Sequence, residues 1–169
     1  ETIAQKDFGF TRRYFTDLKP AMARRSRRLW ASTLPQNVVE NVAPIITTSF
    51  DDSYAFEQGG RRFELYSVRG GETTDSLIVW MPTEKIAFTG NMMGPIFGHV
   101  PNLYTLRGDR IRYVQYYLDS VQRLIDLNPE MLITGHGEPI VGADNIRIQL
   151  TKVRDAVQYI RDATFAGMN

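Results

Sequence analysis

The sequence predicts an α/β fold in which helices lie on one side of a mixed, mainly antiparallel sheet. An unbroken apolar run within Ser76–Met81 is typical of a strand that is covered on both faces. Gly59-Gly60 separates two segments with alternating apolar residues, as in a β-hairpin. Apolar residues recur at helical spacing between 111 and 125 and again between 146 and 160. Together these patterns indicate strands and helices that share one core.

The first 44 residues form a basic, helical segment and a connection. Residues 5–30 combine apolar positions with many arginines and predict a helix, which Pro20 breaks into two pieces. Residues 31–44 are a polar connection. Four arginines between Arg24 and Arg28 predict a solvated helix face, or else a contact with an anionic surface such as lipid headgroups.

Residues 45–169 supply the sheet and two further helices. Besides the hairpin and Ser76–Met81, short strands are expected at Ile45–Phe50, Ile86–Thr89 and Met131–Thr134. The stretch 91–107 is rich in Gly, Pro and aromatic residues, and a loop of that length is usually functional. Asp109 is expected to cap the next helix, which ends at Asn128-Pro129. The last helix is expected to start near Asp144.

Composition excludes several classes of function. The chain of 169 residues has no cysteine, which rules out disulfides, thiolate zinc sites and a Cys nucleophile. It has two histidines, His99 and His136, so a histidine-rich metal site cannot form within one chain. A net charge of +1 argues against binding nucleic acid, and no run reaches the roughly 18 apolar residues of a transmembrane helix. The chain opens at Glu1 without a leader, which favours a piece of a longer protein and leaves the compartment undetermined.

Three polar residues stand beside glycines at strand ends. Glu72 follows Gly70-Gly71, Asn91 follows Gly90, and His136 lies between two glycines. A carboxylate, an amide oxygen and an imidazole can all bind metal, and the carboxylate or imidazole can also act as a base. Each is also an ordinary residue of a solvated turn. Three such groups predict a site on the rim of the sheet, but they do not complete a strong metal site.

A second polar group lies in the loop between 101 and 109. Asn102 and Arg107 combine an amide with an arginine fork, which suits a tetrahedral oxyanion such as sulfate or phosphate. The alternative is that Arg107 pairs with the nearby Asp109. His99 could join this group or cap the loop.

Four of these motifs resemble motifs in the C-terminal half of a metallo-β-lactamase-fold hydrolase of the alkylsulfatase-like branch, and they follow one another along the chain in the same order as in that family. Gly71-Glu72-Thr73 stands where the family has a zinc-binding Gly-His-Thr, and alkylsulfatases carry Glu there too. Thr89-Gly90-Asn91 stands at the metal-bridging Thr-Gly-Asp, and Gly135-His136 at the last ligand. The segment from Asn102 to Arg107 resembles the sulfate-recognising segment of alkylsulfatases.

The resemblance implies one half of an αββα sandwich, with residues 1–169 as a single, truncated domain. It implies a zinc-dependent hydrolase, dinuclear in the intact parent, with metal ligands at Glu72, Asn91 and His136 and substrate contacts at Asn102 and Arg107. The substrate would be a small anionic or ester molecule, and lactones, thioesters and phosphoesters fit the same scaffold as sulfate esters.

Two departures from the family pattern change what is expected of this chain alone. The family's principal motif, His-x-His-x-Asp-His, is absent, and Asn91 replaces the bridging carboxylate. The isolated chain is therefore expected to bind zinc weakly or not at all and to be inactive without the missing N-terminal half. An uncovered sheet predicts a homo-oligomer. The rival hypothesis is a non-catalytic binding or assembly module that retains half of the fold.

Overall fold

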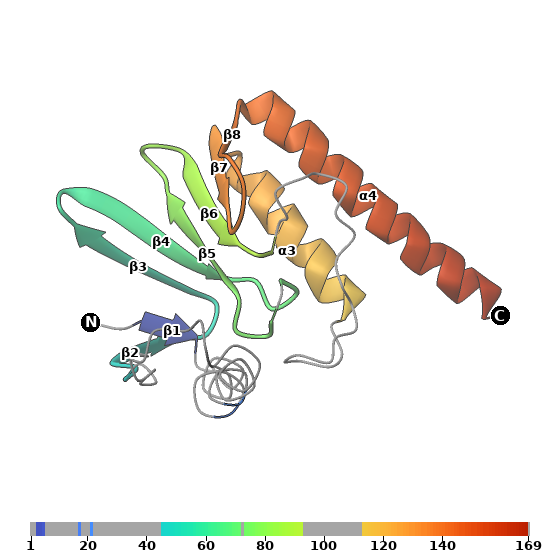
Figure 1. Ribbon diagram of the computed structural model, residues 1–169, viewed down its shortest axis with the longest axis horizontal. Coiled ribbons are helices and arrows are strands. Elements are labelled where there is room, and N and C mark those ends of the chain that lie inside the picture. The colour runs from blue at the N-terminus through green and yellow to red at the C-terminus, as the bar shows by residue number, and fades with distance from the viewer. Residues whose placement is uncertain are drawn as a thin grey trace, which may run out of the picture.

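A six-stranded sheet with two helices on one face forms the main body of the structure (Figure 1). The computed structural model describes residues 3–5, 17, 21, 45–71, 73–92 and 113–168. The strands, in sheet order, are β3 (Ser53–Gln58), β4 (Arg61–Ser67), β5 (Leu77–Met81), β6 (Ile86–Gly90), β7 (Met131–Thr134) and β8 (Ile140–Val141).

The pairing confirms a mixed, mainly antiparallel sheet. Neighbouring strands run antiparallel except for β6 and β7, which are parallel and are joined through a helical crossover. The predicted hairpin joins β3 to β4. Its turn residues Gly59 and Gly60 have φ of 59° and 73°, the left-handed backbone that two-residue hairpin turns require.

A separate two-stranded sheet pairs β1 (Ile3–Gln5) in parallel with β2 (Thr48–Phe50). The strand predicted at 45–50 is thus present over its last three residues. The helical prediction for 5–30 is wrong at Gln5, which lies in β1, while Asp17 and Ala21 are helical. The other residues of that segment, including the arginine cluster, lie outside the described residues.

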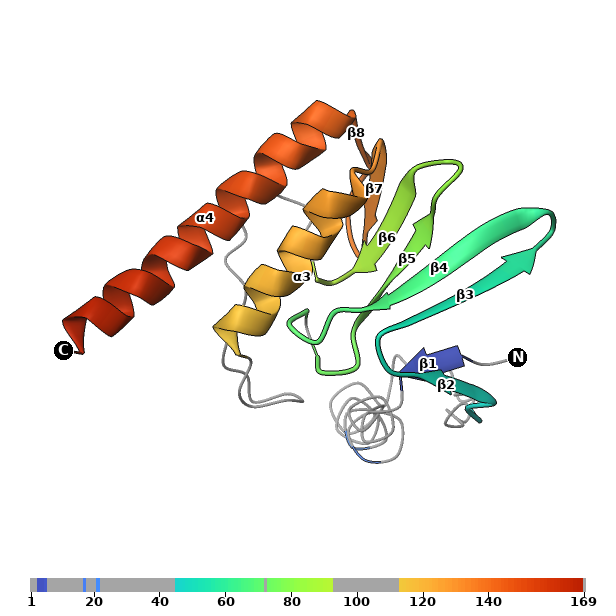
Figure 2. The same ribbon diagram turned by 180° about the vertical axis from the view of Figure 1, so that it is seen from behind.

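Helices α3 (Val114–Leu127) and α4 (Ala143–Gly167) lie side by side on the same face of the sheet (Figures 1 and 2). The predicted apolar stripes are confirmed at Val121, Leu124 and Leu150, which are fully buried in the core. Ile160, at the end of the second stripe, is instead exposed, and Ile111 lies outside the described residues. The expected cap at Asp109 is wrong, because α3 begins at Val114 with Tyr113 at its N-cap. The predicted end is right: Asn128 stops the helix in a left-handed conformation.

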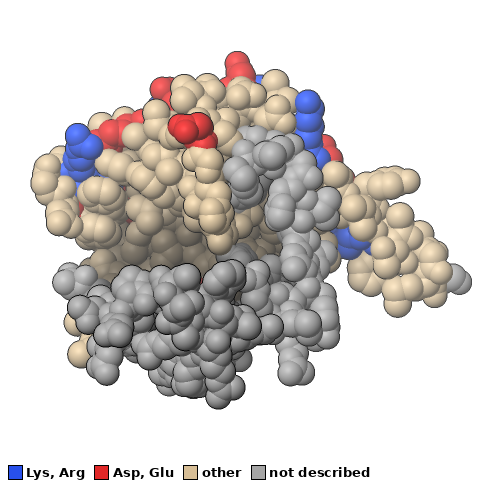
Figure 3. All heavy atoms as spheres, viewed as in Figure 1, with Lys and Arg blue, Asp and Glu red and all other residues tan. Residues whose placement is uncertain are grey.

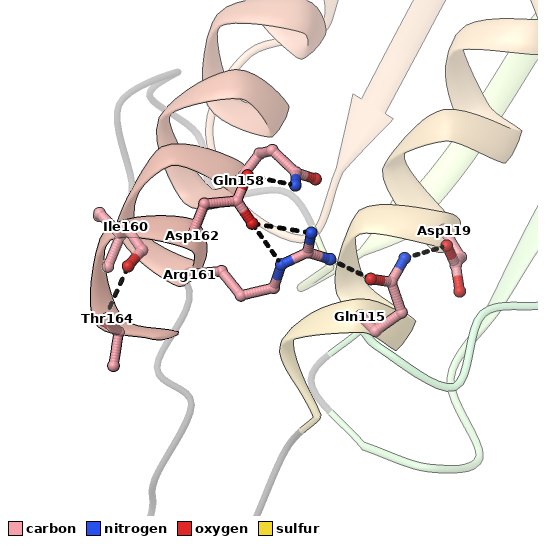
Figure 4. Close-up of polar contacts among 7 residues, drawn as sticks. All are labelled: Gln115, Asp119, Gln158, Ile160, Arg161, Asp162 and Thr164. Atoms are coloured by element: carbon pink, nitrogen blue, oxygen red, sulfur yellow. Dashed lines mark hydrogen bonds and ion pairs between the residues drawn. The ribbon is translucent and has the colours of Figure 1, made fainter. Parts of the chain in front are cut away.

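A repeated polar unit links the two helices. In each unit an arginine of α4 donates to a glutamine of α3, and that glutamine donates to an aspartate four residues on. The units are Arg154–Gln122–Asp126 and Arg161–Gln115–Asp119, and the second is drawn in Figure 4. Because the glutamine number falls as the arginine number rises, the helices are antiparallel, and the repeat fixes their register.

Both faces of the central sheet are apolar. Toward the helices, Ile78, Ala87 and Leu132 are completely buried in the core shared with α3 and α4. The alternate residues of β5 and β6, Val79 and Phe88, are opposite each other and half-buried on the other face. In Figure 3 the charged side chains of the described residues lie mainly along the upper edge and the sides of the view, with uncharged surface below them. Such a sheet is built to lie between two layers.

Candidate functional site at the carboxyl ends of β6 and β7

The carboxyl ends of β6 and β7 lie next to each other because these two strands are parallel. Gly90 pairs in register with Thr134, and the Gly135 amide donates to the Gly90 carbonyl at 2.7 Å. The residues that follow, Asn91 and His136, therefore stand on adjacent loops of one rim. Both are exposed. Two of the three predicted metal ligands are thus brought to the same edge of the sheet.

The side chain of Asn91 packs against the backbone at Gly135. A Cβ at Gly135 would lie 2.0 Å from the Asn91 Oδ1 and 2.9 Å from the Gly90 carbonyl carbon. No side chain other than hydrogen can occupy that position without moving its neighbours. The glycine before His136 therefore makes room for the Asn91 amide, which gives a physical reason for the Gly-His pair.

The backbone of the His136 loop is held locally. The Thr134 hydroxyl donates to the His136 carbonyl at 2.5 Å. Gly137 follows with φ of 81°, a conformation that favours glycine. The imidazole is thus carried on a short, hydrogen-bonded turn at the end of a buried strand.

The end of β6 contains an irregularity that the sequence did not reveal. The β6–β7 register shifts between Phe88 and Gly90, and Thr89 is the residue at the shift. Thr89 is only 3% exposed, yet among the described residues its hydroxyl has no hydrogen-bond partner. Gly90 then adopts φ of 53° and turns the chain toward Asn91. The only sequence signal was a threonine where strand alternation places a buried side chain.

The motif around Glu72 is described only in part. Glu72 lies outside the described residues, but both of its neighbours are described. Gly70 packs directly on the backbone of α3. The Thr73 amide donates to the Ser76 hydroxyl at 3.0 Å, and the Thr73 hydroxyl donates to Asp75 at 2.5 Å. Asp75 thus has a local structural partner. Asn102, Arg107 and His99 also lie outside the described residues.

A small cavity of about 380 Å³ opens on the α3 side of the sheet. Arg123 of α3 forms its wall and makes a two-point ion pair with Asp52, at 2.8 and 2.9 Å. The same guanidinium lies 4.9 Å from the centre of the Tyr66 ring. The hydrogen bond from Arg123 holds the pKa of Asp52 below its ordinary value. This cluster ties the start of β3 to α3, and its charges are already paired.

The described residues do not by themselves fit a zinc ion. No group of three histidine, cysteine, aspartate or glutamate side chains gathers within the described part of the chain. The rim offers one imidazole and one neutral amide, whereas catalytic zinc takes about three protein ligands and a water. Any metal here needs ligands beyond the described residues.

No protein-family model matches the chain. It is 28% identical over 129 residues to a linear primary-alkylsulfatase of Pseudomonas sp., covering 76% of this chain and 23% of that protein. It is 29% identical over 103 residues to an alkyl/aryl-sulfatase of Saccharomyces cerevisiae, covering 59% of this chain and 16% of that protein. The chain therefore spans less than a quarter of the length of these two relatives.

Solved structures share the fold. The stereoselective inverting sec-alkylsulfatase Pisa1 from Pseudomonas sp. superposes with a TM-score of 0.73 at 19% identity, over 100% of this chain and 29% of that one. A metallo-β-lactamase family protein of Thermus thermophilus superposes with a TM-score of 0.64 at 21% identity, over 98% of this chain and 55% of that one. The chain is alkylsulfatase-like in sequence and has the corresponding part of the metallo-β-lactamase fold.

Proposed function

We propose that this chain is part of a metal-dependent hydrolase of the metallo-β-lactamase superfamily that acts on small anionic or ester substrates, sulfate esters among them. The observation that carries the proposal is the contact between Asn91 and Gly135, which brings two strand-end motifs onto one rim. The proposed substrate class is supported by the similarity to a linear primary-alkylsulfatase over 76% of the chain.

In this proposal Glu72, Asn91 and His136 face the metal. When bound, zinc would lower the pKa of a water molecule and polarise the scissile group. Asn102 and Arg107 would hold the anionic part of the substrate, because an arginine fork matches an oxyanion. The remaining ligands would come from a segment with the pattern His-x-His-x-Asp-His, which these 169 residues do not contain.

The second apolar face of the sheet supports the idea of a missing layer. Val79, Phe88 and Ile133 alternate with the core-facing residues and are only half-buried. We propose that residues 1–169 form one partial domain, whose second face is covered by the other half of an αββα sandwich. In the absence of that half, two copies would cover the face together, so the isolated chain would be a homo-oligomer.

The rival proposal is a binding or assembly module that keeps half of the fold without its metals. The amide at position 91 favours it, because a neutral oxygen is a weaker ligand than a carboxylate. The two proposals differ in the zinc affinity expected of Asn91→Asp. If the rim is the metal site of a hydrolase, a carboxylate at position 91 should raise zinc affinity; if the chain is an assembly module, it should not.

Zinc titration by calorimetry tests the proposal. We expect the wild-type chain to bind Zn²⁺ weakly and Asn91→Asp to bind at least about tenfold more tightly, since packing holds the carboxylate in the same place. Asn145→Asp, an exposed site on α4, adds the same charge away from the rim and should change nothing. His136→Ala in the Asn91→Asp background should abolish the gain.

Equal zinc affinity for Asn91→Asp and Asn145→Asp would favour the assembly module. An affinity tighter than about micromolar, or roughly −8 kcal/mol, in Asn91→Asp but not in Asn145→Asp would support a working site.

A further inference from the structure

Thr89 is a buried polar residue near the end of β6. It is 3% exposed, and within the described residues its Oγ1 makes no hydrogen bond. Its backbone is already employed, because the Thr89 carbonyl accepts from the Met92 amide at 3.2 Å. The hydroxyl is therefore the part of the residue that lacks a partner.

A buried hydroxyl without a hydrogen bond is unfavourable, because it loses its bonds to water and gains nothing in return. Valine has nearly the same shape and would avoid that loss. Buried polar groups in folded proteins almost always have a partner, either from the protein or from an ordered molecule. The environment of Thr89 thus indicates a partner that is not a side chain or backbone group of the described residues.

The position of Thr89 in the sheet points to the rim. Thr89 lies at the register shift between Phe88 and Gly90, and such bulges re-aim side chains at the edges of sheets and beside functional sites. Gly90 turns the chain directly after it, and Asn91 then packs its Oδ1 against Gly135. Thr89, which carries the hydroxyl, and Asn91, which carries the amide, are therefore two residues apart in the same irregular turn.

We propose that the Thr89 hydroxyl binds one ordered water molecule, which bridges to the side-chain amide of Asn91 and keeps that side chain in place over Gly135. A buried water needs about two to four polar partners. A hydroxyl can donate and accept, and the Asn91 amide nitrogen has two donors to offer. Thr89 is then a positioning residue for the rim, one step behind the side chains that face the site.

A matched pair of variants tests the water site without any metal. Thr89→Val removes the hydroxyl and keeps the shape, whereas Thr89→Ser keeps the hydroxyl. A crystal structure should show a water about 2.8 Å from the hydroxyl oxygen in wild type and Thr89→Ser, and none at that place in Thr89→Val. Exchange of the Gly135 amide hydrogen, measured by NMR relative to the Leu132 amide in the preceding strand β7, should be at least tenfold faster in Thr89→Val only.

Two results would overturn the proposal. One is a wild-type structure in which a protein group, and no water, meets the hydroxyl. The other is a Gly135 amide that is equally protected in wild type and Thr89→Val. Using Leu132 as the reference separates a local change at the rim from a general loss of stability, which would speed both amides together.

The consequence for metal binding rests on the proposed function and is measured separately. In the Asn91→Asp background, Thr89→Val should weaken Zn²⁺ affinity by about tenfold or more, as is typical when the partner of a ligand is removed, and Thr89→Ser should restore it. If Asn91→Asp binds no zinc, the proposed function fails while the water site stands or falls on the exchange data. If it binds zinc equally with and without the hydroxyl, the positioning role of Thr89 is refuted.

Discussion

Replacing Gly70 by alanine should destabilise the fold strongly, although it adds a single methyl group. Gly70 lies in the loop between β4 and β5 and faces the backbone of α3. A Cβ there would lie 1.9 Å from the Tyr116 carbonyl carbon, 2.0 Å from the Tyr117 amide nitrogen and 2.2 Å from the Tyr116 oxygen. Non-bonded carbon atoms pack at about 3.5–4 Å. The loop and the helix must therefore separate by roughly 1.5 Å.

Neither side of this contact can give way cheaply. The atoms in question are backbone atoms of a helix, and Tyr117 is 2% exposed within the core. Overpacking a core typically costs about 1–3 kcal/mol and occasionally more. We expect Gly70→Ala to lie at or above the upper end, at about 3 kcal/mol. For a domain of this size, that corresponds to a fall in Tm of roughly 6–12 °C.

Urea unfolding followed by circular dichroism measures the change in the free energy of unfolding. Gly167→Ala is the matched control, because it adds the same methyl group at the end of α4 with no atom within 4 Å. It should leave stability unchanged or slightly raised, since alanine favours helix by up to about 1 kcal/mol over glycine. If Gly70→Ala lies within about 0.5 kcal/mol of wild type, the close packing of this loop on α3 is wrong.

Two further predictions concern acid stability and the rim. Arg123 holds the pKa of Asp52 below its ordinary value, so the folded state favours the charged carboxylate. The free energy of unfolding should therefore fall as the pH drops below about 4, where the unfolded chain takes up the proton more readily than the folded one. Asp52→Asn should flatten this fall in urea unfolding experiments between pH 7 and 3. Gly135→Ala should destabilise by displacing Asn91, and the cost should shrink in the double variant with Asn91→Ala, where the clashing oxygen is gone. Additive free energies in that cycle would contradict the contact.

Much of the fold could be predicted from sequence periodicity because burial imposes it directly. The continuous apolar run of β5 and the helical stripe through Val121 and Leu124 both reflect sides that face the core. The strand β8 was missed because it has two residues, Ile140 and Val141, and exists only through pairing with β7. Pairing of that kind leaves no local pattern.

The start of α3 shows why local signals fail at element boundaries. An aspartate at position 109 is a good capping residue, but a cap contributes only about 1 kcal/mol. The helix instead begins at Val114, without a side-chain capping bond, where its first turn reaches the loop around Gly70. The described start of α3 therefore does not follow the local capping signal.

The candidate site shows the same limit at the level of single residues. The motifs around Asn91 and His136 were recognisable as polar residues beside glycines, but nothing in the sequence explained a glycine at 135 itself. Gly135 does not have a positive φ; it is glycine because the Asn91 side chain occupies the place of its Cβ. That reason depends on a partner 44 positions away in the chain, which periodicity cannot supply. The same contact places the Asn91 Oδ1 beside Gly135, at the rim. An aspartate introduced at position 91 would carry its carboxylate at the same place, so its effect on zinc affinity reports directly on whether this edge of the sheet is a metal site.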